Sequence, residues 1–375
     1  MTIWRYITDD SVGAAEGLAL DEALCAGYGR DDQQSPTTLR LYTYRDHAAL
    51  CGRFQHLEAE IDVEACRRTG TEFNRRPTGG GAIIMGEAQL GVAICAPAPV
   101  EEGPKSILLR FSEGIVAGLG MLGIEASFGG KNDLKVAGRK IAGLGLYLNG
   151  SGGLLFHASV LADLDVGFML DVLRIPAAKL GGAAAEAVER RVTTVSRETG
   201  RSWDAKALRE VIADGIAEAM GVELDVSAPT EQEEQMASGL VEAKYGSDEW
   251  RFQRSPQLDA TGTSMIKTRG GLVRLYLALT GETIKSALFT GDFNELPPAL
   301  VELESRLKWS STDRATLSRI ADESLSDGAG LGVSSAEIVE LISSAARRAR
   351  AVGLAAPSRS GSCYFPETTE GASKP

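Results

Sequence analysis

The sequence predicts an α+β protein built from two domains. Short strand-like apolar segments alternate with glycine-marked turns from Thr37 to Leu161. A helical pattern follows over residues 204–221, and a second series of strand and helix patterns begins after a polar, acidic interval. The length of 375 residues also exceeds what most single cores reach. These observations indicate a strand-rich first domain and a smaller second one.

The strands of the first domain are expected where β-branched, aromatic and other apolar residues lie between glycine-rich borders. Helices are expected between and around these strands. The six segments are TLRLYTY, GAIIM, LGVAICA, DLKVAG, KIAGLGLYL and GLLFHASVL.

The clearest helix is expected over DAKALREVIADGIAEAMG. Asp204 precedes the pattern as an N-cap, and Gly221 follows it as a C-terminal stop. The apolar positions recur near helical spacing at Leu208, Val211, Ile212, Ala219 and Met220.

A linker or surface helix is expected at SAPTEQEEQMASG, which is acidic and contains a proline. After it, LVRLYLAL, TGE and TIKSALFTG predict a β-hairpin, and two helical patterns follow near residues 298–309 and 335–353. We therefore expect a catalytic domain over 1–244, an accessory domain over 245–350 and a mobile tail over 351–375, which contains Cys363.

Composition excludes several classes of protein. Apolar residues make up 43% and charged residues 24%, as in ordinary globular proteins. A net charge of −12 argues against nucleic acid as the main partner. No apolar run reaches membrane-span length and no signal peptide is recognisable, so we expect a cytoplasmic protein with no membrane partner. The five cysteines lack metal-ligand spacing and are expected to be reduced thiols.

The first candidate site is NRRPTGGGAIIM, residues 74–85. Glycines let a ligand approach the backbone closely, and successive N–H groups in such a loop can bind an anion. Arg75 and Arg76 add planar, permanently charged donors that fit a carboxylate or phosphate. A glycine hairpin with two solvated arginines is the alternative, and the motif alone leaves both open.

The second candidate is GGKNDLKVAGRKIAGLG, residues 129–145. A hairpin here would bring Asn132, Asp133 and Lys140 to one mouth, where the lysine could offset charge on an acyl phosphate. An ordinary basic hairpin is the competing interpretation.

The third candidate is GGLLFHASVLADLD, where His157 and Ser159 share one side of a strand. A lone histidine in an apolar strand is more often a packed residue than a catalyst. No Ser-His-Asp order is recognisable.

In this order, RRPTGGGA, KNDLKVAGRKIAG and FHASVL resemble the lipoate–protein ligase family of the biotin/lipoate ligase superfamily. LALDEAL, CGRFQHLEAEID and RVTTVSRETGR extend the resemblance, and the chain from EWRFQRSP to about residue 350 is similar to the accessory domain of the longer ligases. The resemblance implies a class II biotin/lipoate-ligase-like catalytic domain with a mixed or antiparallel sheet and flanking helices, plus a smaller α+β accessory domain.

The resemblance also implies a reaction. ATP, with Mg²⁺, activates lipoic acid to lipoyl-AMP, and the lipoyl group then passes to a lysine of a lipoyl-domain acceptor of the H-protein or E2 kind. Lys140 and Arg76 take the catalytic roles, and Asn132, Asp133 and Lys140 hold the nucleotide, with Asp133 also on the metal. The implied substrate-binding residues are Arg75, Gly79, Gly80, Gly81, Ala82, Gly143, His157 and Ser159.

One position separates this expectation from its main alternative, an ATP-independent octanoyl or lipoyl transferase. Cysteine-dependent octanoyltransferases of the superfamily carry Cys-Phe just before the lysine hairpin, whereas this chain has Ser127-Phe128. The serine, together with the ligase-like pair Asn132-Asp133, favours ATP-dependent ligation. Cys95 is a possible stand-in nucleophile, although it lies in an apolar strand.

Two further alternatives are a biotin ligase, disfavoured by the double-arginine loop, and a degenerate acyl-carrier-binding protein. The chain also departs from the ligase pattern at Met85–Gln89 and at Leu144-Gly145. Both departures fall at the expected pocket wall and leave the acyl chain and the acceptor open.

Overall fold

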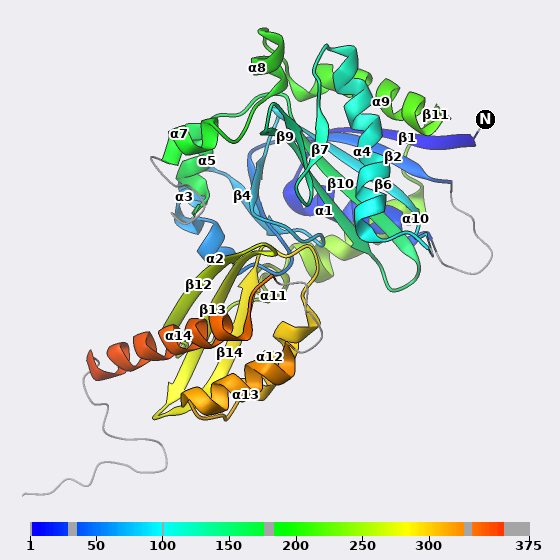
Figure 1. The fold of residues 1–375 in the computed structure, drawn as a ribbon. Helices are drawn as coiled ribbons and strands as arrows, with labels where there is room; N and C mark the ends of the chain where they lie inside the picture. The colour runs from blue at the N-terminus through cyan, green and yellow to red at the C-terminus, as the bar shows by residue number, and fades with distance from the viewer. Residues whose placement is uncertain (1, 29–35, 100, 176–183, 326–331, 356–375) are drawn as a thin grey trace, which may run out of the picture. The chain divides into compact units, whose positions relative to one another are not determined.

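The computed structural model describes residues 2–28, 36–99, 101–175, 184–325 and 332–355, and these form two compact units. The first unit comprises Met1–Ser255 and Thr290–Leu296, and the second comprises Pro256–Phe289 and Pro297–Pro375. The ribbon is shown in Figure 1. Cys363 lies outside the described residues.

The first unit contains a mixed sheet of eight described strands, in the order β11-β1-β2-β6-β10-β9-β8-β7. β1 pairs in parallel with both β11 and β2, and the other neighbours are antiparallel. The structure confirms the expected α+β class with a mixed sheet. The strands are β1 (Thr2–Val12), β2 (Thr38–Tyr44), β6 (Gln89–Pro97), β7 (Ser127–Gly129), β8 (Asp133–Val136), β9 (Arg139–Leu148), β10 (Gly153–Leu161) and β11 (Val222–Val226).

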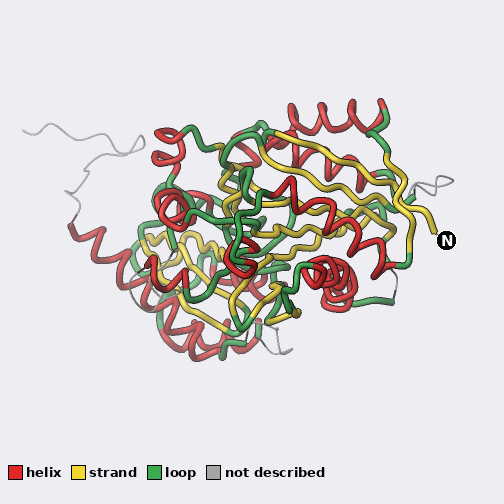
Figure 2. The backbone as a smooth tube through the Cα atoms, turned by 90° about the horizontal axis from the view of Figure 1, so that it is seen from above, coloured by secondary structure: helices red, strands yellow, loops and turns green. Residues whose placement is uncertain are grey.

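One face of this sheet is covered by two helices, α4 (Pro104–Met121) and α9 (Ala205–Met220), which lie side by side in Figures 1 and 2. Their apolar stripes interlock with alternate residues of the strands, such as Leu41, Val92 and Phe156, because successive strand residues point to opposite faces. The predicted caps of α9 are confirmed. Asp204 accepts a hydrogen bond from the N–H of Ala207, and Gly221 is left-handed with φ +64°.

The opposite face is covered by α1 (Ala14–Ala26), which packs Leu18 and Leu24 against Tyr42, Cys95 and their neighbours. A small sheet β4-β3-β5 carries the arginine–glycine motif. Its strands are β3 (Ala48–Cys51), β4 (Glu72–Arg75) and β5 (Ile83–Met85). The helices α2 (Leu57–Glu60), α3 (Val63–Thr69), α5 (Val166–Val172), α7 (Ala184–Glu189) and α8 (Val195–Thr199) complete this part of the unit.

The interval expected to be a linker or surface helix forms α10 (Glu231–Leu240), followed by the π-helix η1 (Val241–Tyr245) and α11 (Asp248–Arg251). Lys244 of η1 is ion-paired with Glu22 of α1 at 2.6 Å. Residues 245–255 pack in the first unit, whereas the sequence places the boundary after residue 244. How the chain divides into independently folding domains stays a prediction.

The second unit contains the sheet β12-β13-β14, and its β13–β14 hairpin is the one predicted from LVRLYLAL-TGE-TIKSALFTG. The last helix continues to Ala355, past the expected start of the tail at residue 351. The elements are β12 (Gly262–Thr268), β13 (Gly271–Thr280), β14 (Thr283–Gly291), α12 (Pro298–Leu307), α13 (Arg314–Ser324) and α14 (Ser335–Ala355).

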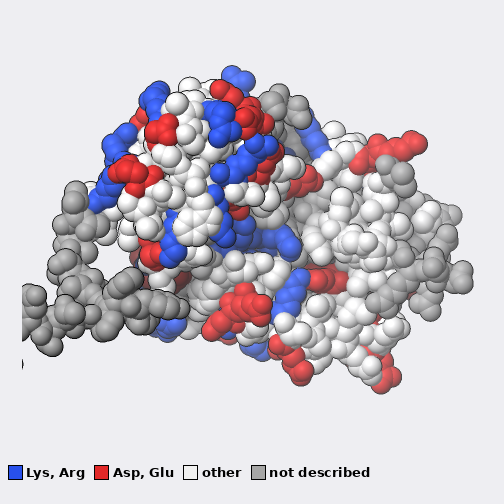
Figure 3. Space-filling model, turned by 90° about the horizontal axis from the view of Figure 1, so that it is seen from below, with Lys and Arg blue, Asp and Glu red and all other residues white. Residues whose placement is uncertain are grey.

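Two surface observations bear on partners. Figure 3 shows Lys and Arg side chains interspersed with Asp and Glu side chains on the face that it draws. Within the described ranges, each helix is too short or too polar to cross a membrane. The cytoplasmic location stays a prediction.

Candidate active site

A cavity of about 100 Å³ in the first unit brings the three sequence motifs together. It lies between the arginine–glycine loop, the start of β9 and the middle of β10. Of the predicted site residues, Arg76, Gly81, Ala82, Asn132, Lys140, Gly143, His157 and Ser159 line it, and Arg75, Gly79, Gly80 and Asp133 do not. The other lining residues are Leu18, Tyr42, Tyr44, Leu50, Thr78, Ile83, Met85, Leu144, Gly145 and Ala158.

The more exposed end of the cavity holds an ion pair between Lys140 Nζ and Asp133 Oδ1, 2.9 Å apart. Strand register explains the meeting: Gly143 of β9 stands opposite Asp133 on β8 and opposite Ser159 on β10. A Cβ on Gly143 would lie 2.7 Å from Lys140 Nζ, so glycine leaves the space that the ammonium group occupies. Asp133, Gly143 and Ser159 thus form one row across the sheet, and the Lys140 side chain reaches over Gly143 to this row.

The backbone around Lys140 is fixed on both sides. Its N–H donates to the Arg191 carbonyl and its own carbonyl accepts from the Thr193 N–H. Asn132 holds the other side of the row: its side-chain amide donates to the Leu144 carbonyl at 2.9 Å, and its carbonyl accepts from the Leu144 N–H at 2.8 Å. These contacts fix the backbone of Lys140, while its side-chain ammonium group stays accessible.

Arg76 organises the glycine loop from inside. Its guanidinium donates to the carbonyls of Leu50, Gly79 and Gly81 at 2.8–2.9 Å and to the Thr78 hydroxyl at 3.2 Å. Burial lowers its pKa to about 10, which leaves it charged at neutral pH. Arg76 therefore holds the loop through the loop's backbone carbonyls, and one side of the arginine faces the cavity.

Arg75 departs from its predicted substrate-binding role. Its buried guanidinium donates to the carbonyls of Gly52, Arg53 and Gln55, and on its other side to those of Trp250 and Arg251. Burial lowers its pKa, and it lies outside the cavity lining. The two arginines of the predicted anion site therefore differ: Arg76 lines the cavity, whereas Arg75 hydrogen-bonds the backbone of residues 250–251 and so links it to β4.

The glycine loop is compressed between two other backbone segments. The Gly80 N–H donates to the Phe293 carbonyl at 2.7 Å, and a Cβ on Gly79 would clash with the carbonyls of Phe293 and Asn294. On the other side, a Cβ on Gly52 would clash with the Gly80 carbonyl. Close backbone packing therefore requires glycine at 79 and at 52, and the positive φ of +92° favours glycine at 80. The sequence did not reveal the packing because residues 290–296 are distant in the chain.

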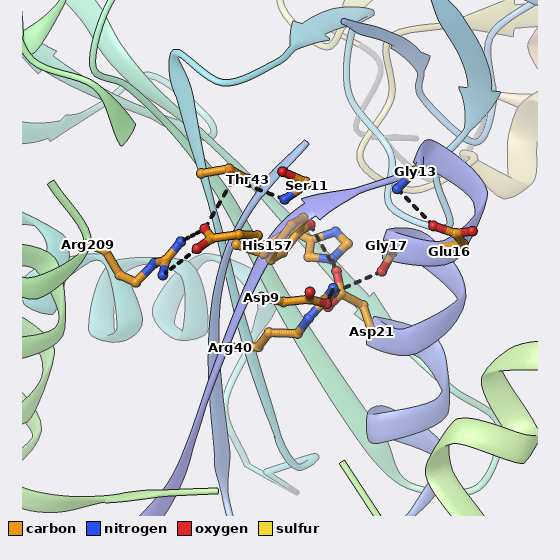
Figure 4. Close-up of polar contacts among 12 residues, drawn as sticks. Asp9, Ser11, Gly13, Glu16, Gly17, Asp21, Arg40, Thr43, His157 and Arg209 are labelled. Carbon is orange, nitrogen blue, oxygen red and sulfur yellow. Dashed lines mark hydrogen bonds and ion pairs between the residues drawn. The ribbon is translucent and has the colours of Figure 1, made fainter. Parts of the chain in front are cut away.

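The deep end of the cavity is backed by a buried charge cluster, shown in Figure 4. Asp21 of α1 accepts from Arg40 at 2.6 Å and from the Tyr42 hydroxyl at 3.0 Å, and lies 2.6 Å from His157 Nε2. Arg40 also contacts Asp9 and the Gly17 carbonyl. Burial alone would raise the pKa of Asp21, but Arg40 and His157 outweigh it and hold that pKa below its usual value.

Sequence reasoning placed LALDEAL only in the family resemblance and assigned Asp21 no role. An available signal was the position: Asp21 follows the apolar run Leu18-Ala19-Leu20 at helical spacing from Leu18 and Leu24, and a carboxylate on that face needs a buried partner. The sequence indicated His157 as a candidate site residue, and the structure shows that Asp21 lies against both His157 and Arg40.

The described cysteines do not supply a nucleophile to the cavity. Cys25, Cys51, Cys66 and Cys95 are all free and buried, and none lines the cavity. Burial raises the pKa of Cys95 well above its ordinary value and that of Cys25 to about 12. Ser127 is exposed on β7 opposite Lys135, outside the cavity lining.

Asp133, which was predicted to bind a metal ion, forms an ion pair in the structure. Its carboxylate is paired with Lys140, and the described ranges hold no cluster of three His, Cys, Asp or Glu side chains arranged for a metal ion. The metal role of Asp133 stays a prediction.

A family model, the lipoyl protein ligase A/B catalytic domain, matches residues 13–217. That range contains all three motifs and covers more than half of the chain. The chain belongs to this family. It is accordingly an enzyme of the lipoate and biotin ligase superfamily.

Two relatives of the family match along their whole length. Octanoyltransferase LipM of Symbiobacterium thermophilum is 31% identical over 280 residues, covering 68% of this chain and 99% of that protein. Octanoyltransferase LipM of Kyrpidia tusciae is 30% identical over 278 residues, covering 68% of this chain and 100% of that protein. Among solved structures, the bi-partite lipoate protein ligase of Thermoplasma acidophilum, described with its E2 lipoyl domain, aligns with a TM-score of 0.61 at 25% identity, covering 68% of this chain and 99% of that one.

These relatives confirm the expected ligase-like fold and overturn the expected reaction. The prediction of an ATP-dependent ligase is wrong, because the relatives that match over their full length are octanoyltransferases. The prediction depended on Ser127 in place of a cysteine and on the ligase-like pair Asn132-Asp133. The lack of a cysteine nucleophile does not imply that the reaction needs ATP, because an acyl thioester is already activated toward an amine. ATP and Mg²⁺ were expected only for adenylation, and acyl transfer from a thioester requires neither.

Proposed function

We propose that this protein transfers an octanoyl-type acyl group, without ATP, from a carrier-bound thioester to a lysine of a lipoyl-domain protein. The full-length match to octanoyltransferases carries the proposal. The cavity supports it, because an apolar interior of Leu18, Leu50 and Met85 ends at the cationic Lys140. A medium-chain acyl group would fill the interior and place its carbonyl carbon at Lys140.

The reaction needs one bond exchange. The neutral amine of the acceptor lysine attacks the thioester carbonyl, the C–N bond forms, the C–S bond breaks, and the proton lost from nitrogen ends on the departing thiol. In the tetrahedral intermediate the carbonyl oxygen carries negative charge. Lys140 lies at the cavity end where this charge would develop, and Asp133 keeps its ammonium group oriented until the substrate arrives.

We propose direct transfer between donor and acceptor rather than passage through an enzyme thioester. The described cysteines are buried away from the cavity, with raised pKa values at Cys25, Cys51, Cys66 and Cys95. A protein that holds both substrates at one site gains its rate from proximity and charge stabilisation.

The deciding experiment combines purified protein, an octanoyl thioester of an acyl carrier and a lipoyl-domain acceptor, with intact mass of the acceptor as readout. Acceptor mass should rise by one octanoyl group without nucleotide. Free octanoate or lipoate with ATP and Mg²⁺ is the matched comparison and should give no modification. Modification that depends on ATP and a free acid, with none from the thioester, would overturn the proposal.

A further inference from the structure

A second cavity of about 280 Å³ lies in the first unit on the other side of the glycine loop. Pro77 and Gly79 line this cavity, whereas Thr78 and Gly81 line the first one, so alternate residues of one loop face the two spaces. Gly145 of β9 lines both. The loop is thus a partition, and Thr78 approaches Gly145 so closely that a Cβ there would lie 3.1 Å from Thr78.

The wall of the second cavity includes an open strand edge. β9 pairs with β10 along its length, but its pairing toward β8 ends at Leu144, whose N–H donates to Asn132. Beyond that point, the described residues contain no strand on this side of β9. The residues from Gly145 to Leu148 line the cavity.

The direction of the backbone groups on this edge follows from two hydrogen bonds. The Leu144 N–H points toward β8, and the Asn149 N–H donates across the hairpin to the Gly153 carbonyl. Because antiparallel strands alternate, Leu146 shares the direction of Leu144 and presents its N–H and carbonyl to the open side. A bound group with an amide could pair there as an added strand does.

We infer that the second cavity binds the amide-bearing arm of the acyl donor, a pantetheine-type thiol linker, along the open edge of β9. The inference rests on the proposed function, because a carrier protein cannot itself enter the first cavity and needs a linker to bring its thioester to Lys140. The arm runs along Gly145, the residue of β9 that lines both cavities, and this contact brings its thioester end toward the first cavity. Leu108, Leu146 and Phe54 cover its methylene groups.

The chemistry of the wall favours the donor arm over the acceptor lysine. A lysine side chain is an unbranched methylene chain with no amide, so it would leave the Leu146 N–H and carbonyl without a partner. A pantetheine-type arm carries amides and has the bulk to occupy a cavity larger than the first one. The acceptor lysine then approaches Lys140 from the exposed end of the first cavity.

The test compares two octanoyl donors, the thioester of pantetheine and the thioester of 2-mercaptoethanol, which has no amide. Wild-type protein should prefer the pantetheine donor about 10-fold in kcat/KM, the scale of one added hydrogen-bonding group. Leu146→Pro removes an N–H on the open side while leaving the β10 bonds, and should erase that preference by raising the KM for the pantetheine donor. Leu146→Ala keeps the N–H and is the matched control.

The amide-free donor reports whether the first cavity and the fold remain intact. If Leu146→Pro does not fold, Leu148→Pro makes the same test one repeat further along the edge. Equal use of the two donors by wild-type protein, an equal loss on both donors, or a raised KM for the acceptor instead would each overturn the inference. Wild-type protein inactive on both donors would mark failure of the proposed function itself, and the inference would fall with it.

Discussion

The two ends of the first cavity use the same pairing of a carboxylate with a cation, but differ in burial. Asp21 and Arg40 are each 0% exposed, whereas the side chains of Asp133 and Lys140 are 27% and 31% exposed. A buried pair cannot lose one member without leaving an uncompensated charge, while an exposed pair can be re-solvated. The deep pair is therefore held in place by the fold, whereas the exposed pair can separate at little cost.

The largest expected effect lies at the deep end. Asp21→Asn should lower the free energy of unfolding by about 3–5 kcal/mol, because Arg40 is left buried without its carboxylate. Urea denaturation followed by circular dichroism measures it. The matched variant Asp133→Asn should cost no more than about 1 kcal/mol. Equal losses in the two variants would show that burial does not distinguish the pairs.

Acid should reveal the same difference in the wild-type protein. The folded pKa of Asp21 is lowered, so its contribution to stability is complete above the ordinary aspartate pKa of about 3.9 and is lost as pH falls through the folded value. The stability gap between wild type and Asp21→Asn should therefore stay constant from pH 5 to 7 and shrink below about pH 4. Urea midpoints of both proteins across this range provide the check, and a gap that widens in acid would contradict the assignment.

At the exposed end the expected effect is on rate. Lys140→Ala should reduce kcat for acyl transfer on the order of 10²-fold, since it removes a preorganised charge from the carbonyl oxygen. Its urea midpoint should stay close to wild type because the pair is solvated. Lys140→Arg keeps the charge and should recover part of the rate. A folded Lys140→Ala protein with wild-type kcat would remove Lys140 from the mechanism.

A smaller effect is expected for chain length. Met85 departs from the ligase pattern and lines the cavity at 3% exposure. Met85→Ala should raise the ratio of kcat/KM for decanoyl over octanoyl donors by about 10-fold, the contribution of roughly two buried methylenes. Competition between the two donors, read by acceptor mass, measures the ratio. An unchanged ratio would place the end of the acyl chain elsewhere.

The smallest effect concerns the nucleophile. If transfer is direct, Ser127→Ala should keep kcat within about twofold of wild type, because no acyl-enzyme forms there. Ser127→Cys serves as the companion variant. A large loss in the alanine variant, or an octanoyl adduct trapped on residue 127 by mass spectrometry, would replace direct transfer with a two-step route.

Local pattern predicted much of this molecule. The helix from Asp204 to Gly221 and the β13–β14 hairpin follow from capping, periodicity and turn residues within short windows. The three motifs also meet at one cavity, as the family resemblance implied. Contacts between distant segments were beyond reach: Asp21 with His157, Arg75 with Arg251, and Gly80 with Phe293 all join residues far apart in the chain.

The reaction type shows another limit. Ser127 and the pair Asn132-Asp133 favoured the ligase, although a few side chains rarely fix whether an acyl donor is activated before or during catalysis. The similarity to octanoyltransferases extends over 99–100% of their length and 68% of this chain, and it corrected the prediction.

The hydrogen bond from the Gly80 N–H to the Phe293 carbonyl affects the order in which the first unit folds during translation. Residues 1–255 leave the ribosome well before Thr290–Leu296, yet both belong to the same unit. Domains fold as they emerge, N-terminal parts first. The nascent first unit can close its sheet early, but its glycine loop waits for some forty further residues, about two to eight seconds at ordinary translation rates. The glycine loop is therefore the last part of its own unit to be completed.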